Sequence, residues 1–276
     1  MTDSTAWRSW DRATLSAAYN NNAAVPSGSE MVAGWAAASA ALRAHHPAGL
    51  DQLYGTTPRQ GWDLFPAARA DAPCLVFIHG GYWQKNSREG FSCIIEGALA
   101  KGWSAALPSH TLAPEAGMTA IVEEMRAAMD WLGTQGRSRG IAGPVILSGW
   151  SAGGHLTALL ADHPLVRAAL PISAIFDLAP IQGTGLNDAL KLTEAEIEAF
   201  SPQRLALVQK PMAVAYGAAE LPELCRQSVE FHARRAAGGA PGPLLAVKGA
   251  NHFSILDALR QPEGELLHAA EALLRG

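Results

Sequence analysis

The sequence has few charged residues and no excess of basic ones. Only 17% of its 276 residues are charged, and 21 lysines and arginines against 25 aspartates and glutamates leave a net charge of −4. Proteins that bind nucleic acid carry clusters of lysine and arginine against the phosphates, so we expect no nucleic-acid role. The hydrophobic share of 49% is ordinary for a globular protein. A chain of this length can form one domain around one large core.

Cysteines, targeting signals and long apolar runs are also scarce or absent. The three cysteines, Cys74, Cys93 and Cys225, are an odd number without CxxC or Cys/His ligand spacing. This favours reduced core thiols over disulfides or a metal site. The first residues, MTDSTAWRSWDR, lack the basic start and apolar core of a signal peptide, and no apolar run reaches about 18 residues. We therefore expect a cytoplasmic protein that binds neither metal nor membrane, and the sequence leaves a homodimer open.

What the chain does have is an alternation of strand-like and helix-like segments. Short β-branched and aromatic runs bounded by glycine and proline alternate with longer runs that have one apolar face. This alternation predicts an α/β fold with a mostly parallel central sheet and helices on both faces. We expect strands over residues 74–81, 103–109, 144–149, 168–176, 211–216 and 243–247, and helices over residues 87–101, 116–132, 153–161 and 222–236 and at the C-terminus.

Two segments depart from this alternation within an expected single domain of residues 1–276. Residues 1–61 form a small N-terminal extension with a predicted helix over residues 29–45, and WDLFPA (62–67) follows as an expected antiparallel edge strand. The second segment is an insertion over residues 177–210, which contains the helix-like LTEAEIEAF (192–200). It is expected either to form a small cap over a pocket or to be a plain connecting helix.

The sequence GWSAG (149–153) is the most informative motif in the chain. It matches G-x-S-x-G and lies between a predicted strand and a predicted helix. A sharp turn there brings neighbouring backbones too close for a β-carbon, so glycines are required, and the turn exposes the serine hydroxyl. The pattern predicts that Ser151 is a nucleophile; the alternative is a glycine-rich turn with an inert serine.

A nucleophilic serine needs a histidine base and a carboxylate that orients it. His252, in GANHFS after the last predicted strand, is our candidate base. Glu220 follows the strand that ends near residue 216, and the order Ser151, Glu220, His252 agrees with the order nucleophile, acid, base of α/β-hydrolases. Asp177 and Glu223 remain alternatives for the acid.

The tetrahedral oxyanion also needs fixed N–H donors. HGGYW (79–83) directly follows a predicted strand, and two glycines let backbone amides face a ligand without obstruction. We expect donors from Gly80 or Gly81 and from Ala152, the residue after the nucleophile.

Aromatic side chains flank both motifs. Tyr82, Trp83 and Trp150 are expected to bind substrate as an aromatic wall; the alternative is packing in the core.

These motifs carry a family resemblance. Residues 62–276 resemble an α/β-hydrolase, and the chain is similar to the kynurenine formamidase (arylformamidase) group in HGGYWQ (79–84), LAPEA (112–116), GWSAGGHL (149–156), IFDLAPI (175–181) and ELPELCRQS (220–228). Two features depart from the family pattern: its acid is commonly Asp where Glu220 stands, and its S-Y-x-L-A-P tract is SHTLAP (109–114) here.

The resemblance implies a serine hydrolase that cleaves the formamide of N-formylkynurenine to kynurenine and formate, with no cofactor. The alternatives are a carboxylesterase, lactonase or amidase for another small molecule, acyl transfer through the same acyl-enzyme, and a non-catalytic binding protein on the same fold.

Overall fold

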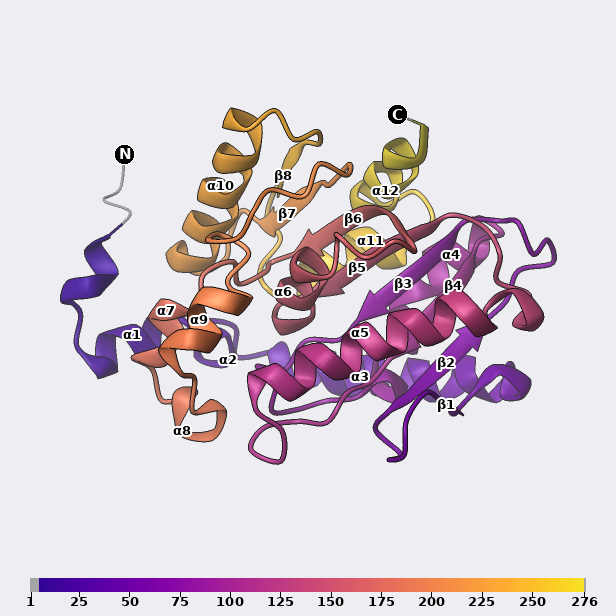
Figure 1. The fold of residues 1–276 in the computed structure, drawn as a ribbon, viewed down its shortest axis with the longest axis horizontal. Helices are drawn as coiled ribbons and strands as arrows, with labels where there is room; N and C mark the ends of the chain where they lie inside the picture. The colour runs from indigo at the N-terminus through magenta and orange to yellow at the C-terminus, as the bar shows by residue number, and fades with distance from the viewer. Residues whose placement is uncertain (1–4, 276) are drawn as a thin grey trace.

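An eight-stranded sheet forms the centre of the molecule, for which a computed structural model describes residues 5–275 (Figure 1). The strand order is β1-β2-β4-β3-β5-β6-β7-β8; β2 is antiparallel to its two neighbours, and all other pairs are parallel. The strands are β1 (Gln52–Leu53), β2 (Gly61–Phe65), β3 (Cys74–Ile78), β4 (Ser104–Pro108), β5 (Val145–Trp150), β6 (Val166–Ile172), β7 (Val214–Gly217) and β8 (Leu244–Val247). The predicted mostly parallel sheet is confirmed.

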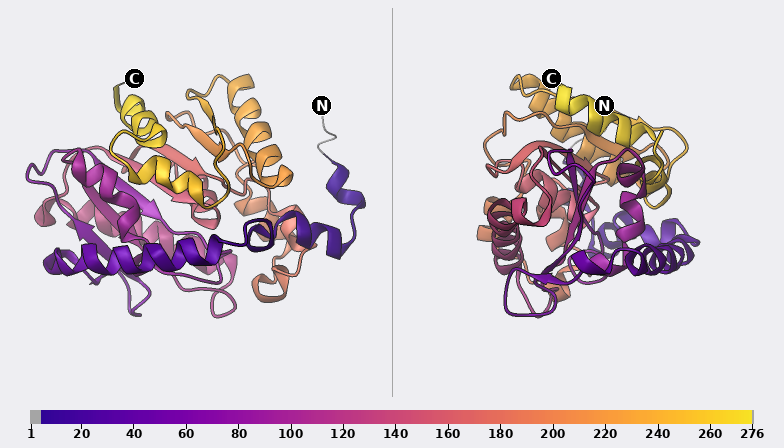
Figure 2. Two further views of the ribbon diagram at one scale, coloured as in Figure 1. Left: turned by 180° about the vertical axis from the view of Figure 1, so that it is seen from behind. Right: turned by 90° about the vertical axis from the view of Figure 1, so that its right-hand side faces the viewer.

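Helices cover both faces of this sheet. One face carries α5 (Met118–Gln135), α6 (Ala152–Leu159) and α10 (Pro222–Ala237), and the other carries α3 (Gly28–Ala44), α4 (Glu96–Ala100), α11 (Asp257–Arg260) and α12 (Glu265–Arg275), which Figure 2 shows from behind. The central strands β3, β4 and β5 are buried along their whole length. Their continuous apolar character, rather than an alternating one, follows from burial on both faces.

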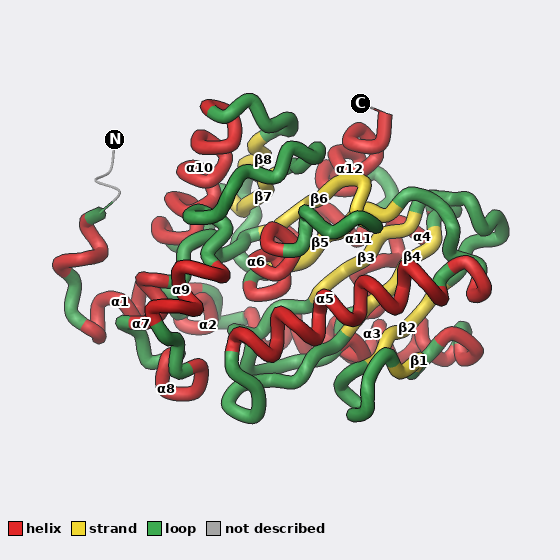
Figure 3. The backbone as a smooth tube through the Cα atoms, viewed as in Figure 1, coloured by secondary structure: helices red, strands yellow, loops and turns green. Residues whose placement is uncertain are grey.

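The N-terminal segment and the insertion after β6 lie together near the carboxyl ends of the strands. The first contributes α1 (Arg12–Ala18) and α2 (Asn21–Ala24), and the second contributes α7 (Ala179–Gln182), α8 (Asn187–Leu190) and α9 (Glu194–Phe200), joined by loops in Figure 3. Arg12 forms an ion pair with Asp188, and the backbone N–H of Gly185 donates to Ser16 Oγ over 3.0 Å. Segments about 170 residues apart in sequence are thus held side by side.

Short 3-10 helices complete the secondary structure. They span η1 (Ala6–Ser9), η2 (Pro47–Gly49), η3 (Arg88–Gly90), η4 (Ser92–Ile95), η5 (Arg137–Arg139) and η6 (Ser254–Leu256). No helix among residues 5–275 is both long enough and apolar enough to cross a membrane.

Three sequence expectations are wrong in detail. The strand predicted over residues 62–67 is antiparallel but is not at the edge, because β1 pairs outside it. The helix predicted over residues 87–101 is split into η3, η4 and α4; residues 92–95 are buried on every side, so no polar face remains for an amphipathic helix. The strand predicted to reach residue 176 ends at Ile172, because Ser173 has a φ of +49° that turns the chain out of the sheet.

Candidate active site

Ser151 stands at the tight turn between β5 and α6, with a φ of +57° and a ψ of −118°. The turn depends on its glycines. A β-carbon at Gly153 would lie 2.1 Å from the carbonyl oxygen of Ile78, and one at Gly149 would lie 2.4 Å from the carbonyl oxygen of Gly153. Only a residue without a side chain fits at these two positions, so the motif holds Ser151 in a left-handed conformation at the end of a central strand.

His252 and Glu220 form a buried pair at the same edge of the sheet. The Nδ1 atom of His252 lies 2.9 Å from Glu220 Oε2. The other carboxylate oxygen accepts hydrogen bonds from the hydroxyl of Ser173 at 2.5 Å and from the backbone N–H of Gly217 at 2.6 Å. With Nδ1 donating its proton to the carboxylate, Nε2 of His252 is the nitrogen able to accept a proton.

Ser151 and His252 line one small cavity of about 220 Å³. The indole N–H of Trp150 donates to the carbonyl oxygen of His252 over 2.7 Å, and this bond fixes the histidine loop beside the serine turn. Among residues 5–275, no hydrogen bond to Ser151 Oγ is formed. Such nucleophile–base contacts are often long before substrate binds.

The two alternative acids are engaged away from His252. Asp177 forms an ion pair with Arg204 and accepts the backbone N–H of Ala179. Glu223 is paired with Arg226 at 2.7 Å. Of the three carboxylates considered from the sequence, Glu220 is therefore the one that the fold brings to the imidazole.

The loop after β3 packs directly against the serine turn. A β-carbon on Gly80 would lie 3.1 Å from Ser151 Cβ, and one on Gly81, where φ is +125°, would lie 2.4 Å from the Lys85 carbonyl oxygen. Ala152 is the first residue of α6, so its N–H has no acceptor within the helix. Of the residues predicted to supply oxyanion donors, Gly80 and Ala152 adjoin Ser151, and Gly81 lines the same cavity as the serine.

Two side chains fix the orientation of the peptide between Gly80 and Gly81. The carbonyl oxygen of Gly80 accepts a hydrogen bond from Asn86 Nδ2 at 3.1 Å and another from His79 Nδ1 at 2.9 Å. Because a peptide is planar, holding the carbonyl of Gly80 also sets the direction of the Gly81 N–H. Asn86 itself has a φ of +72° and lines the cavity.

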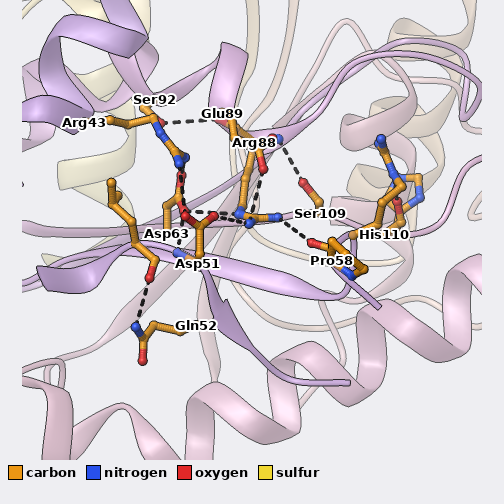
Figure 4. A network of polar contacts seen from close by, with 12 residues as sticks. Arg43, Asp51, Gln52, Pro58, Asp63, Arg88, Glu89, Ser92, Ser109 and His110 are labelled. Atoms are coloured by element: carbon orange, nitrogen blue, oxygen red, sulfur yellow. Dashed lines mark hydrogen bonds and ion pairs between the residues drawn. The ribbon is translucent and has the colours of Figure 1, made fainter. Parts of the chain in front are cut away.

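A buried ionic network anchors the far end of this loop (Figure 4). Arg88 donates from Nε to Asp63 Oδ1 at 3.1 Å and from Nη2 to Asp51 Oδ1 at 2.6 Å, and its backbone N–H donates to Ser109 Oγ at 2.9 Å. Arg43 forms a second ion pair with Asp63, which is fully buried on β2. The residues that follow the oxyanion loop are thereby tied to β2, β4 and α3.

The predicted aromatic wall is only partly present. Trp150 and Tyr82 line the cavity, but Trp83 does not; it is 2% exposed and packs edge-on against His155. Tyr82 and Trp83 both have positive φ angles, +56° and +60°, so the loop turns between them and Trp83 lies on its inner side. The expectation that Trp83 contacts substrate is not supported, because Trp83 does not line the cavity. Tyr82 and Trp150 do line it, and contact between substrate and these two side chains stays a prediction.

Three further histidines are neutral parts of the core. Burial lowers the pKa of His79 to about 3, with help from the neighbouring His110, and burial lowers the pKa values of His110 and His155 to about 4. His79 and His110 stack with ring centroids 5.4 Å apart. They support the loop behind the serine without titrating near neutral pH.

Comparisons with known proteins agree with this fold. The BD-FAE family matches residues 63–167. Kynurenine formamidases from Danio rerio and Salmo salar are 27% and 29% identical, each over 76% of this chain and 76% of the relative. The crystal structure of a candidate thioesterase from Silicibacter sp. TM1040 is 29% identical and covers 93% of this chain and 98% of its own, with a TM-score of 0.82.

The chain is a hydrolase of the α/β-hydrolase fold. Several residues that surround the hydrolase's site gave no signal in the sequence. Ser173 donates a hydrogen bond to Glu220, and Asn86 donates one to the carbonyl oxygen of Gly80. Helix α2 supplies Asn21 and Asn22 to the cavity wall, and α3 supplies Ser29 and Val32. A polar residue at the carboxyl end of a strand, as Ser173 is after β6, is the one pattern that could have pointed to a site residue.

The hydroxyl of Tyr82 connects the hydrolase's oxyanion loop to its N-terminal segment. It donates to the carbonyl oxygen of Tyr19 at 3.0 Å and accepts from the backbone and side-chain amides of Asn21, both at 3.2 Å. The segment before α3, predicted only as an extension, is therefore part of the wall of the candidate active site.

Proposed function

We propose that the hydrolase cleaves an aryl formamide of the N-formylkynurenine type through a formyl-enzyme on Ser151. The observation that carries the proposal is the buried pair of His252 and Glu220, joined over 2.9 Å at the wall of the cavity that contains Ser151. The similarity to kynurenine formamidases supports the choice of substrate.

The proposed reaction runs through two tetrahedral intermediates. His252 Nε2 accepts the proton of Ser151 as its oxygen attacks the formamide carbonyl, while Glu220 stabilises the imidazolium. The amides of Gly81 and Ala152 donate to the oxyanion, and one such donor contributes roughly 3 kcal/mol to transition-state stability. His252 then protonates the departing arylamine. In the second half it activates a water, which releases formate and restores the Ser151 hydroxyl.

The size of the cavity agrees with a small acyl group. At about 220 Å³ the cavity beside Ser151 is smaller than the roughly 300 to 1,000 Å³ of typical ligand pockets. A formyl group is the smallest acyl group, so most of a formamide substrate is leaving group. Trp150 and Phe253 add aromatic surface to the same wall, which suits an aromatic leaving group.

The test compares formamide with ester turnover by the purified protein. We expect a higher kcat/KM for N-formylkynurenine than for 4-nitrophenyl acetate or butyrate. Ser151→Ala is expected to abolish turnover and covalent labelling by an organophosphonate while the thermal melt stays cooperative. Absence of N-formylkynurenine hydrolysis by the folded wild-type protein would refute the formamidase assignment, and labelling of the Ser151→Ala variant would remove Ser151 from its role.

A carboxylesterase or thioesterase is the second candidate function. The candidate thioesterase of Silicibacter sp. TM1040 has nearly the same chain length and fold, and the proposed acyl-enzyme route applies equally to esters and thioesters. A preference for short acyl esters or thioesters over formamides in the same assay would favour it. Lactonase, amidase or acyl-transfer activity and a non-catalytic binding role stay as the less supported alternatives.

Two further expectations concern the whole protein. We propose that it acts in the cytoplasm on a small molecule, and the homodimer that the sequence leaves open stays a prediction. Light scattering after size-exclusion chromatography would give the assembly state, and fractionation of the producing cells would give the compartment.

A further inference from the structure

A second cavity adjoins the one that contains Ser151. It measures about 280 Å³ and lies between the N-terminal segment, the loop after β3 and residues 184–186 of the insertion. The two cavities share Asn22, Tyr82 and Lys85 as lining residues. The two cavities are therefore neighbours, and the side chains of these three residues form their common border.

Of residues 5–275, Lys85 is the only lysine, arginine, aspartate or glutamate that lines either cavity. Among residues 5–275 its ammonium group forms no ion pair or hydrogen bond, and the side-chain amide of Asn22 has no hydrogen-bond partner either. The other polar lining residues bear hydroxyl, amide or backbone groups, and His252 is hydrogen-bonded to Glu220. The two cavities together thus have one uncompensated positive charge at the point where they meet.

Two carboxylates that adjoin the lining of the second cavity already have partners. Asp188, which follows the lining residues 184–186, is paired with Arg12. Glu223 is paired with Arg226 and accepts the hydroxyl of Tyr19, a lining residue, at 3.3 Å. Within residues 5–275 Lys85 thus has no carboxylate partner.

We propose that Lys85 determines specificity by binding a carboxylate on the leaving group of the substrate. The inference rests on the proposed function, because a formyl group leaves the rest of the molecule to fill the second cavity. In an amino-acid-bearing aryl formamide, the aromatic ring lies beside Tyr82 and the carboxylate reaches Lys85, with the amide of Asn22 as a neutral second donor.

The test uses two substrates that differ only at the group proposed to meet Lys85, N-formylkynurenine with its carboxylate and the corresponding carboxamide. Lys85→Met is expected to lower kcat/KM for N-formylkynurenine about fivefold through KM, the loss expected for one partly solvated ion pair, and to leave the carboxamide unchanged. Lys191→Met is the matched control, because Lys191 is also exposed and without an ion pair but lines neither cavity. Added salt should reduce the preference of the wild-type protein for the substrate with the carboxylate, because salt screens an ion pair with Lys85.

The proposal is overturned if Lys85→Met slows both substrates equally or slows neither. A failure of the proposed function is distinguishable from this outcome. If the wild-type protein hydrolyses neither formamide, the same comparison is made with 4-acetoxybenzoate and 4-acetoxybenzamide. A preference for the anionic ester that Lys85→Met removes would support the role of Lys85, and a preference that persists in the variant would refute it.

Discussion

Replacing Glu220 by glutamine changes one atom of the candidate site, and the structure dictates the outcome. The Oε1 atom of Glu220 accepts from two donors, the hydroxyl of Ser173 and the backbone N–H of Gly217. In Glu220→Gln the amide oxygen must keep that position, because an NH₂ group cannot accept these bonds. The amide NH₂ therefore faces Nδ1 of His252, which now has to accept a hydrogen bond.

The cost of this change follows from the tautomer. When Nδ1 of His252 accepts, the ring proton moves to Nε2, and the imidazole can no longer take the proton of Ser151. A wrong tautomer of the base lowers kcat by roughly 10⁴-fold in a serine–histidine–carboxylate triad. Because Glu220 lies behind the imidazole and does not line the cavity, KM should change little.

The assay measures kcat and KM for N-formylkynurenine, or for 4-nitrophenyl acetate if that is the better substrate. Thermal melts confirm that the variant is folded. Two controls accompany it: Ser173→Ala, which removes one hydrogen bond to the carboxylate and should cost at most about tenfold, and Glu223→Gln, which alters a carboxylate paired with Arg226. A near-normal kcat for Glu220→Gln would refute the reasoning and move the acid to Asp177 or Glu223.

Three further outcomes are expected. Asn86→Gly removes the hydrogen bond to the Gly80 carbonyl, and glycine tolerates the positive φ at this position. We expect kcat to fall about tenfold with little change in KM. An unchanged kcat would show that the peptide between Gly80 and Gly81 is held in place without Asn86. Tyr82→Phe removes the three hydrogen bonds of its hydroxyl and should lower the free energy of unfolding by about 1 to 2 kcal/mol. It should also speed cleavage of the chain before α3 by an added protease, and an unchanged rate of that proteolysis would contradict this expectation. Burial lowers the pKa of His155 from 6.5 to about 4, so as the pH falls the unfolded chain binds a proton at this residue before the folded chain does. The free energy of unfolding should therefore decrease between pH 6.5 and about 4, by roughly 2 kcal/mol at pH 5 for one such histidine. Urea titrations at several pH values should show a smaller decrease for His155→Gln.

The local motifs could be predicted because their physics is local. A glycine pair at the end of a strand and G-x-S-x-G before a helix fix backbone conformation over a few residues. The structure accordingly shows Ser151 at a φ of +57° where the motif predicted a strained turn. His252 and Glu220 could be proposed because the carboxyl ends of parallel strands share one edge of a sheet. The contact between them, at 2.9 Å, is what the structure adds.

Other elements were out of reach for the same physical reason. The helix expected over residues 87–101 fails because Arg88 is tied to Asp63 on a distant strand and the residues after it are buried on all sides. Trp83 resembles a pocket residue in sequence, but two consecutive positive φ angles place it in the core. Neither effect leaves a periodicity or composition that a single sequence displays.

The strand and helix alternation and the turn at Ser151 follow from residues close together in the chain, and the candidate base follows from the order of the strands that this alternation predicts. The folded chain was needed to show which carboxylate meets His252, how Asn86 holds the Gly80 peptide, and that residues before α3 line the cavity beside Lys85. These contacts join side chains to partners on other elements, so they exist only once the sheet edge and the loops above it are assembled.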